Sequence, residues 1–155
     1  KVIDLYKDRQ MPFLAFESAE DIDPDDETRK YYQELISWSN EIVIIYPLWW
    51  GSFPAILKNW VDYVFTMGFA AKYNDKGMPE GLLKGRRVRV LSTSGAPTWL
   101  YCINGIRRAN KKIWKQTIIK FCGMNFDGYH LFGGMGTTGQ KTEKLFTCVK
   151  KLANK

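Results

Sequence analysis

The fold is decided by a strand and the loop that follows it, Glu41-Ile42-Val43-Ile44-Ile45-Tyr46-Pro47-Leu48-Trp49-Trp50-Gly51. The unbroken apolar run at 42–45 is rich in β-branched residues, which is typical of a parallel strand buried on both faces. Pro47 ends the strand because proline has no backbone N–H to donate to a neighbouring strand. Pro54 then suits the first turn of a helix, and apolar side chains recur at helical spacing as far as Phe65. The segment predicts one strand-loop-helix unit of an α/β fold.

The same alternation continues on both sides of this unit. Acidic residues at 23–26 are expected to cap the helix that follows them. The further elements that we expect are strands at 2–5, 87–92 and 124–132, helices at 28–40, 100–121 and 140–152, and a long loop at 69–85. Strands that alternate with helices predict a parallel sheet covered on both faces, in a three-layer α/β/α arrangement. The length of 155 residues, without repeat or linker, suits a single domain spanning residues 1–155.

The composition excludes several classes of protein. With 45% hydrophobic and 25% charged residues, and no apolar run approaching the ~20 residues of a membrane helix, we expect no membrane span. Cys102, Cys122 and Cys148 are widely spaced and form no CxxC pair, so we expect reduced thiols in a cytoplasmic protein. His130 is the only histidine, which argues against a histidine-based metal site.

Charge is distributed unevenly along the chain, although the formal net charge is +7. Residues 1–75 carry 7 Lys/Arg against 13 Asp/Glu, whereas residues 76–155 carry 16 against 3. The basic half suits a solvated positive surface or a phosphate-bearing nicotinamide partner. A nucleic-acid partner is not expected, because no recognised nucleic-acid motif accompanies the charge.

Ligands of such sheets bind beyond the carboxyl ends of the strands, which draws attention to the loops at 46–53, 92–98 and 133–139. The adjacent indoles of Trp49 and Trp50 suit stacking on a flat aromatic ring, but core packing or a dimer contact would also explain them. The run Ser92-Thr93-Ser94-Gly95-Ala96 offers hydroxyls and backbone to a ring carbonyl or a developing anion, and it also suits an ordinary turn. No GxSxG, P-loop or GxGxxG motif is present.

The order of motifs over residues 1–150 resembles that of the flavodoxin-like NAD(P)H:quinone oxidoreductases. The most specific block is 46–65, YPLWWGSFPAILKNWVDYVF, and Gly68-Phe69-Ala70, Leu91-Ser92-Thr93-Ser94-Gly95, Tyr101 and Phe121-Cys122-Gly123 follow in the family's order. The resemblance implies a flavodoxin-like fold and a bound flavin, either FMN or FAD.

The resemblance also implies roles for single residues. Those expected to line the isoalloxazine ring are Pro47, Leu48, Trp49, Trp50 and Gly51. Those expected at its pyrimidine side are Thr93, Ser94, Gly95, Ala96 and Tyr101. The catalytic candidates are the amides of Ser94 and Gly95 and the hydroxyl of Tyr101, which would stabilise negative charge on the reduced flavin. Phe69 and Tyr73 are expected to shape the substrate pocket across a homodimer interface.

The implied reaction is hydride transfer from NAD(P)H to the flavin N5, and then to a quinone or similar aromatic acceptor. The alternative is a non-catalytic flavodoxin-like regulatory or electron-carrier module, although such carriers are usually acidic. Arg107 stands where some family members have a histidine; it cannot relay a proton, but it could stabilise an anionic flavin or contact a cofactor phosphate. The family's first strand and flavin-phosphate loop have no counterpart here, so we expect a sheet lacking its first strand-helix unit.

Overall fold

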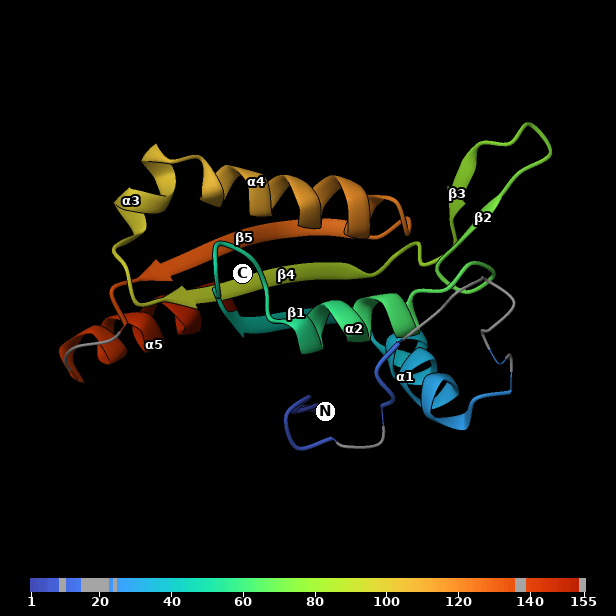
Figure 1. Ribbon diagram of the computed structural model, residues 1–155, viewed down its shortest axis with the longest axis horizontal. Helices are drawn as coiled ribbons and strands as arrows, with labels where there is room; N and C mark the ends of the chain where they lie inside the picture. The colour runs from blue at the N-terminus through green and yellow to red at the C-terminus, as the bar shows by residue number, and fades with distance from the viewer. Residues whose placement is uncertain (9–10, 15–22, 24, 136–138, 154–155) are drawn as a thin grey trace.

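Three parallel strands form the central sheet of the computed structural model, in the order β1–β4–β5 (Figure 1). The structure describes residues 1–8, 11–14, 23, 25–135 and 139–153. The elements are α1 (Glu27–Trp38), β1 (Glu41–Pro47), α2 (Ala55–Val64), β2 (Ala71–Tyr73), β3 (Pro79–Gly81), β4 (Arg87–Ser94), α3 (Thr98–Ile103), α4 (Ile106–Lys112), the π-helix η2 (Ile113–Lys120), β5 (Asn125–Gly133) and α5 (Gly139–Ala153). The register places Tyr46 beside Ser92, and Ser94 beside Gly133.

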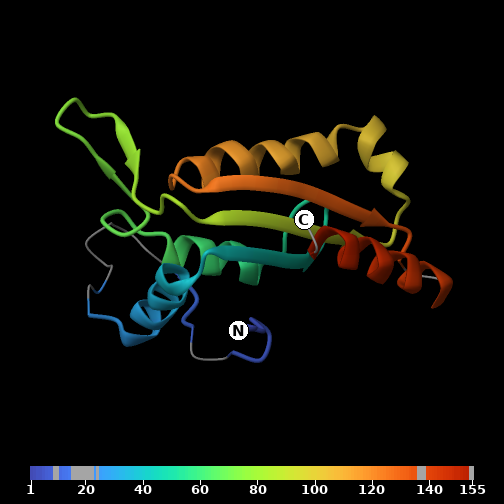
Figure 2. The same cartoon turned by 180° about the vertical axis from the view of Figure 1, so that it is seen from behind.

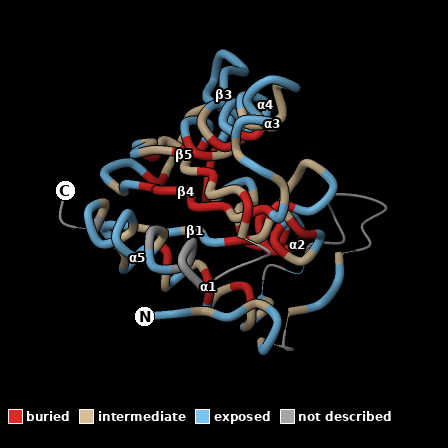
Figure 3. The backbone as a smooth tube through the Cα atoms, turned by 90° about the vertical axis from the view of Figure 1, so that its left-hand side faces the viewer, coloured by how far each residue is buried: buried red, intermediate tan, exposed pale blue. Residues whose placement is uncertain are grey.

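Helices cover both faces of this sheet. Figures 1 and 2 show α2 on one side of the strands and α5 on the other, and the view in Figure 3 places α4 on the same side as α2. Buried positions gather in β4, β5 and α2 (Figure 3). Val90 of β4, Val64 of α2 and Ile119 of η2 have almost no exposed surface. The predicted parallel α/β/α fold is therefore confirmed.

Strand β1 lies at the edge of the sheet, because β4 is its only partner among the described residues. Its side chains Val43 and Ile45 are 47% and 69% exposed. They line a groove of about 590 Å³ that residues 1–6 also line. The prediction that this strand is buried on both faces is therefore wrong for these two positions.

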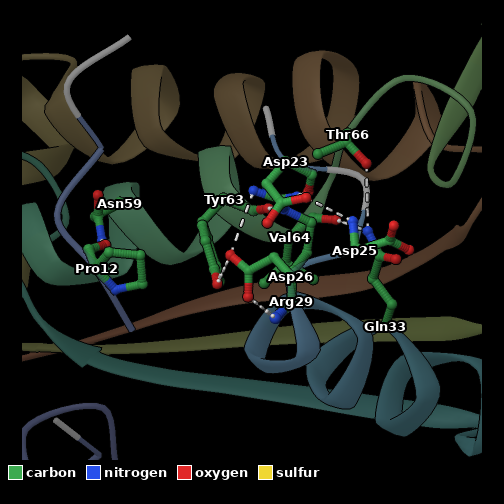
Figure 4. Close-up of polar contacts among 10 residues, drawn as sticks. All are labelled: Pro12, Asp23, Asp25, Asp26, Arg29, Gln33, Asn59, Tyr63, Val64 and Thr66. Atoms are coloured by element: carbon green, nitrogen blue, oxygen red, sulfur yellow. Dashed lines mark hydrogen bonds and ion pairs between the residues drawn. The ribbon is translucent and has the colours of Figure 1, made fainter. Parts of the chain in front are cut away.

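A buried arginine ties α1 to α2 (Figure 4). Arg29 is 6% exposed, its Nε donates to the carbonyl of Tyr63 (3.0 Å), and its guanidinium lies over the Tyr63 ring. It also donates to the carbonyl of Asp23 and pairs with Asp26. As predicted for the acidic start of this helix, Asp26 is the N-cap and accepts from the backbone N–H of Arg29 (3.1 Å).

Three local predictions are wrong. Residues 2–5 are not a strand, since a strand requires a ladder partner and Asp4 instead accepts turn hydrogen bonds from the amides of Lys7 and Asp8. The expected loop at 69–85 contains the antiparallel hairpin β2–β3, whose turn is ordered by the Asn74 side chain accepting two backbone N–H groups. The expected helix at 100–121 is broken by Gly105, which adopts φ +78° between α3 and α4.

Candidate functional site

A tight turn follows β1 at residues 49–52. The N–H of Trp49 donates to the carbonyl of Ser52, and the N–H of Ser52 donates to the carbonyl of Trp49, both at 2.9 Å. The two central residues have φ +50° for Trp50 and +78° for Gly51, as a type I′ turn requires. Among the described residues, Trp50 is the one non-glycine with a left-handed backbone. A bulky residue in this conformation is strained, and such strain tends to persist at functional sites.

The two tryptophans of this turn point outward. Trp50 is fully exposed and Trp49 is 53% exposed, whereas Leu48 and Tyr46 before them are buried. Among the described residues, Tyr6 is the aromatic neighbour of the Trp49 ring, at 6.3 Å between centroids. Core packing, one of the alternatives for these indoles, is therefore excluded for Trp50 within this chain.

Helix α4 packs against this turn and holds it in place. Asn110 of α4 donates its side-chain N–H to the carbonyl of Gly51 (2.7 Å), and Ile106 would lie 3.4 Å from a Cβ placed on Gly51. Further along, Trp114 donates its indole N–H to the buried hydroxyl of Tyr46 (2.9 Å). Sequence reasoning missed these residues; the available signal was the spacing of four between Ile106, Asn110 and Trp114, which places them on one helical face.

The second candidate loop contacts the first directly. Leu48 donates its N–H to the carbonyl of Thr93 (2.6 Å), so the backbones at 48 and 93 lie side by side. Thr93 and Ser94 belong to β4, and Gly95 is exposed just beyond it. The structure thus brings together, at the carboxyl ends of β1 and β4, the residues predicted to line the isoalloxazine ring and those predicted at its pyrimidine side.

The sequence suggested that the hydroxyls of this loop are available to a ligand. In the structure, two of the three are buried. Ser92 has no exposed surface, and its hydroxyl bonds that of Tyr129 (2.9 Å). Ser94 is 5% exposed and donates to the carbonyl of Ala96 (2.9 Å). Ser92 and Ser94 point to one face of the sheet and Thr93 to the other, and only Thr93 of the three is partly exposed. The Ser94–Ala96 segment therefore offers a ligand its backbone more than its hydroxyls.

Helix α3 brings Tyr101 to the same edge. It is fixed at its start by Thr98, whose hydroxyl accepts the N–H of Gly133 (2.8 Å), and a Cβ on Gly133 would lie 2.2 Å from the Thr98 nitrogen. Tyr101 is half-buried against the core, whereas Trp99 and Ile103 are 62% and 78% exposed. Helix α3 thus presents a partly apolar, partly aromatic surface just beyond the carboxyl end of β4.

Phe69 and Tyr73 lie apart from this site. Phe69 is half-buried, and Tyr73 is 63% exposed on β2. Figure 1 shows the β2–β3 hairpin at one end of the molecule, whereas the arrowheads of β4 and β5 point to the other end, beside α3. One chain therefore does not bring these two residues to the predicted flavin loop.

Burial keeps two titratable groups neutral, Tyr46 at the site and Cys122 away from it. Burial raises the pKa of the Tyr46 hydroxyl, so it remains a hydrogen-bond donor and acceptor. Burial likewise raises the pKa of the Cys122 thiol to about 11, which makes it unreactive at neutral pH.

In the described part of the chain, no group of three or more His, Cys, Asp or Glu side chains is placed to hold a metal ion. None of the described helices has the length and apolar character needed to cross a bilayer.

Known proteins identify the family. The family described as having a flavodoxin-like fold matches residues 1–155. A Haemophilus influenzae protein named "Uncharacterized NAD(P)H oxidoreductase" is 30% identical over 145 residues, covering 91% of this chain and 70% of that protein. The chain belongs to this family of flavodoxin-like oxidoreductases. The predicted family is thus confirmed.

Two further family members agree with this placement. The "FMN-dependent NADH:quinone oxidoreductase" of Caldicellulosiruptor bescii is 30% identical over 157 residues, covering 96% of this chain and 76% of that protein. The solved NAD(P)H:quinone oxidoreductase from Methanothermobacter marburgensis superposes with a TM-score of 0.74 at 25% identity, covering 95% of this chain and 74% of that one. The predicted flavodoxin-like fold is confirmed by this likeness.

Proposed function

We propose that this flavodoxin-like oxidoreductase binds a flavin at the edge formed by residues 46–51 and 93–96, and uses NAD(P)H to reduce a quinone or similar aromatic acceptor. The observation that carries the proposal is the fully exposed indole of Trp50, held on a strained left-handed backbone where two strands end. A planar ligand would cover that indole and recover the apolar surface that the protein leaves in water.

The residues at this edge fit the ring of a flavin. Trp49 and Trp50 offer aromatic faces, Pro47, Leu48 and Gly51 shape the loop, and the backbone of Thr93 to Ala96 offers hydrogen-bonding groups for a ring edge. When bound, the flavin supplies hydride transfer through its N5 atom. The amides of Ser94 and Gly95 and the hydroxyl of Tyr101 would then hold negative charge at the pyrimidine edge. Arg107, half-buried at the start of α4, would add a permanent positive charge.

We infer FMN as the first cofactor to test, since the Caldicellulosiruptor and other relatives are named FMN-dependent; FAD is the second. A cytoplasmic location is supported by the three cysteines, all of which are free thiols. A homodimer is supported by the distance between the β2–β3 hairpin and the flavin loop within one chain (Figure 1), since a second copy could bring Phe69 and Tyr73 to that loop.

The test is spectroscopic. The full-length protein is titrated with FMN and, separately, with FAD, and NADH or NADPH is then added without oxygen. We expect flavin absorption bands that bleach on reduction and return when a quinone is added. A protein that takes up neither flavin would contradict the proposal. Flavin uptake without reduction by either nicotinamide would instead favour the non-catalytic carrier or regulatory module.

A further inference from the structure

Asn110 is a buried amide that donates one hydrogen bond to the turn at 49–52 and one to its own helix. The residue is 2% exposed. Its Nδ2 donates to the carbonyl of Gly51 (2.7 Å) and to that of Ile106 one turn earlier (3.0 Å). Its Oδ1 has no hydrogen-bond partner in the described residues. A buried acceptor without a partner costs free energy, and an apolar side chain at this position would avoid that cost. The hydrogen bond that Asn110 donates to Gly51 offsets the cost and explains why an asparagine stands here.

The carbonyl that Asn110 holds belongs to the turn's second left-handed residue. The Gly51 carbonyl belongs to the peptide unit between Gly51 and Ser52, and Ser52 is bonded back to Trp49 across the turn, so fixing this carbonyl restricts the whole turn and the Trp50 backbone within it. The Ile106 side chain packs against Gly51 from the same helix, and Trp114 anchors Tyr46 at the start of the loop. The row Ile106, Asn110 and Trp114 therefore holds the loop at both ends.

We propose that Asn110 is a positioning residue that keeps Trp50 in its strained conformation and so sets the plane that the indole presents to the flavin. The second half of this statement rests on the proposed function. The first half does not, because it concerns the turn alone. Without the Asn110 donor, the backbone of Trp50 would relax toward negative φ, which bulky residues prefer, and the indole would turn away.

Two variants and one control separate positioning from general stability. Asn110→Ala removes the donor, and Asn110→Asp keeps the shape but sets an acceptor against two carbonyl oxygens. The control is Asn59→Ala on α2. Asn59 is also buried, and it holds the chain at Pro12 and Leu14 by two hydrogen bonds (Figure 4 shows the bond to Pro12), away from the turn.

The first measurement needs no flavin. Native-state hydrogen exchange is followed at the amides of Trp49 and Ser52, which bond one another across the turn. We expect exchange at least about tenfold faster in both Asn110 variants, and no selective change at these amides in Asn59→Ala. Unchanged exchange in the Asn110 variants would overturn the proposal. Loss of the fold in both would also overturn it, since Asn110 would then be a general structural residue.

The second measurement is the FMN dissociation constant. We expect it to rise about three- to tenfold in Asn110→Ala, the range for one lost hydrogen bond, and to change less than about twofold in Asn59→Ala. Faster exchange with an unchanged dissociation constant would overturn the link to flavin. If the unmodified protein binds no flavin while exchange still rises, the proposed function fails and the positioning of the turn stands.

Discussion

Trp50 is unfavourable for the stability of the fold but well placed for binding a planar ligand. Its indole is fully exposed, so the folded protein buries nothing with it, and its φ of +50° is unfavourable for any side chain. Such a residue lowers the stability of the chain. Its presence is explained if the indole contributes to binding instead.

The substitution Trp50→Gly should therefore raise stability while it weakens flavin binding. We expect a gain of about 1 kcal/mol, or about 2–4 °C in the melting temperature, because glycine adopts positive φ without strain. The FMN dissociation constant should rise about tenfold from the lost stacking contact. Thermal denaturation and FMN titration measure the two effects. A destabilised variant would show that the indole has a structural role.

A second residue-scale prediction concerns the bond between Trp114 and Tyr46. Tyr46→Phe leaves the buried indole N–H of Trp114 without its acceptor, so we expect a loss of about 1–3 kcal/mol by urea denaturation. Adding Trp114→Phe should cost less than the sum of the single changes, because the two groups interact. Trp60→Phe is the control, since the Trp60 indole N–H has no partner among the described residues. Strict additivity would argue against the bond.

At the scale of the element, the first helix carries an acid-sensitive start. Partial burial raises the pKa of Asp26, but hydrogen bonds from Tyr63 and from the backbone of Arg29 and Thr28, with the Arg29 charge, outweigh it and hold the pKa below its ordinary value. A carboxyl with a depressed pKa stabilises the fold above its unfolded-state pKa, and this contribution is lost as the pH falls through the folded-state pKa.

The fold should therefore lose stability from about pH 4 downward, where an unperturbed aspartate titrates. Asp26→Asn keeps an effective N-cap but removes the charge, so the variant should be less stable at neutral pH and less sensitive to acid. Melting temperatures between pH 3 and pH 7 test this. Parallel curves for the two proteins would contradict the assignment to Asp26.

Elements defined by local patterns were predictable from sequence, and those defined by distant contacts were not. The apolar stripe of α2 and the β-branched run of β1 placed those elements to within a few residues. Strand β2 was missed because Ala71-Lys72-Tyr73 acquires its conformation by pairing with β3, and residues 2–5 were overpredicted because no described strand pairs with them.

The candidate site divides in the same way. Trp49 and Trp50 follow a strand directly, so their place at the sheet's edge followed from the chain itself. Asn110 was missed because its contact with Gly51 joins residues 59 positions apart. The spacing of four with Ile106 and Trp114 indicates a shared helical face but not what that face contacts. The inward turn of the Ser94 hydroxyl was also missed, because β4 extends two residues further than its apolar pattern.

At the scale of the whole molecule, the separation of the hairpin from the flavin loop predicts a shared pocket. We expect a dimer of about twice the 18.0 kDa chain by sedimentation equilibrium. Tyr73→Ala should raise KM for the quinone several-fold while leaving the FMN dissociation constant unchanged, because Tyr73 would contact the substrate and not the flavin. A monomer with full activity would contradict the shared pocket.

The exposed side of β1 has a practical consequence for handling the protein. No described strand of residues 1–155 pairs with the outer edge of β1, and in this chain such an edge is a template onto which another strand can add. Val43 and Ile45 supply the apolar surface, and no lysine or proline interrupts the strand before Pro47. Refolding from denaturant should therefore give yields that fall as the chain concentration rises, and a charged residue in place of Ile45 should restore them.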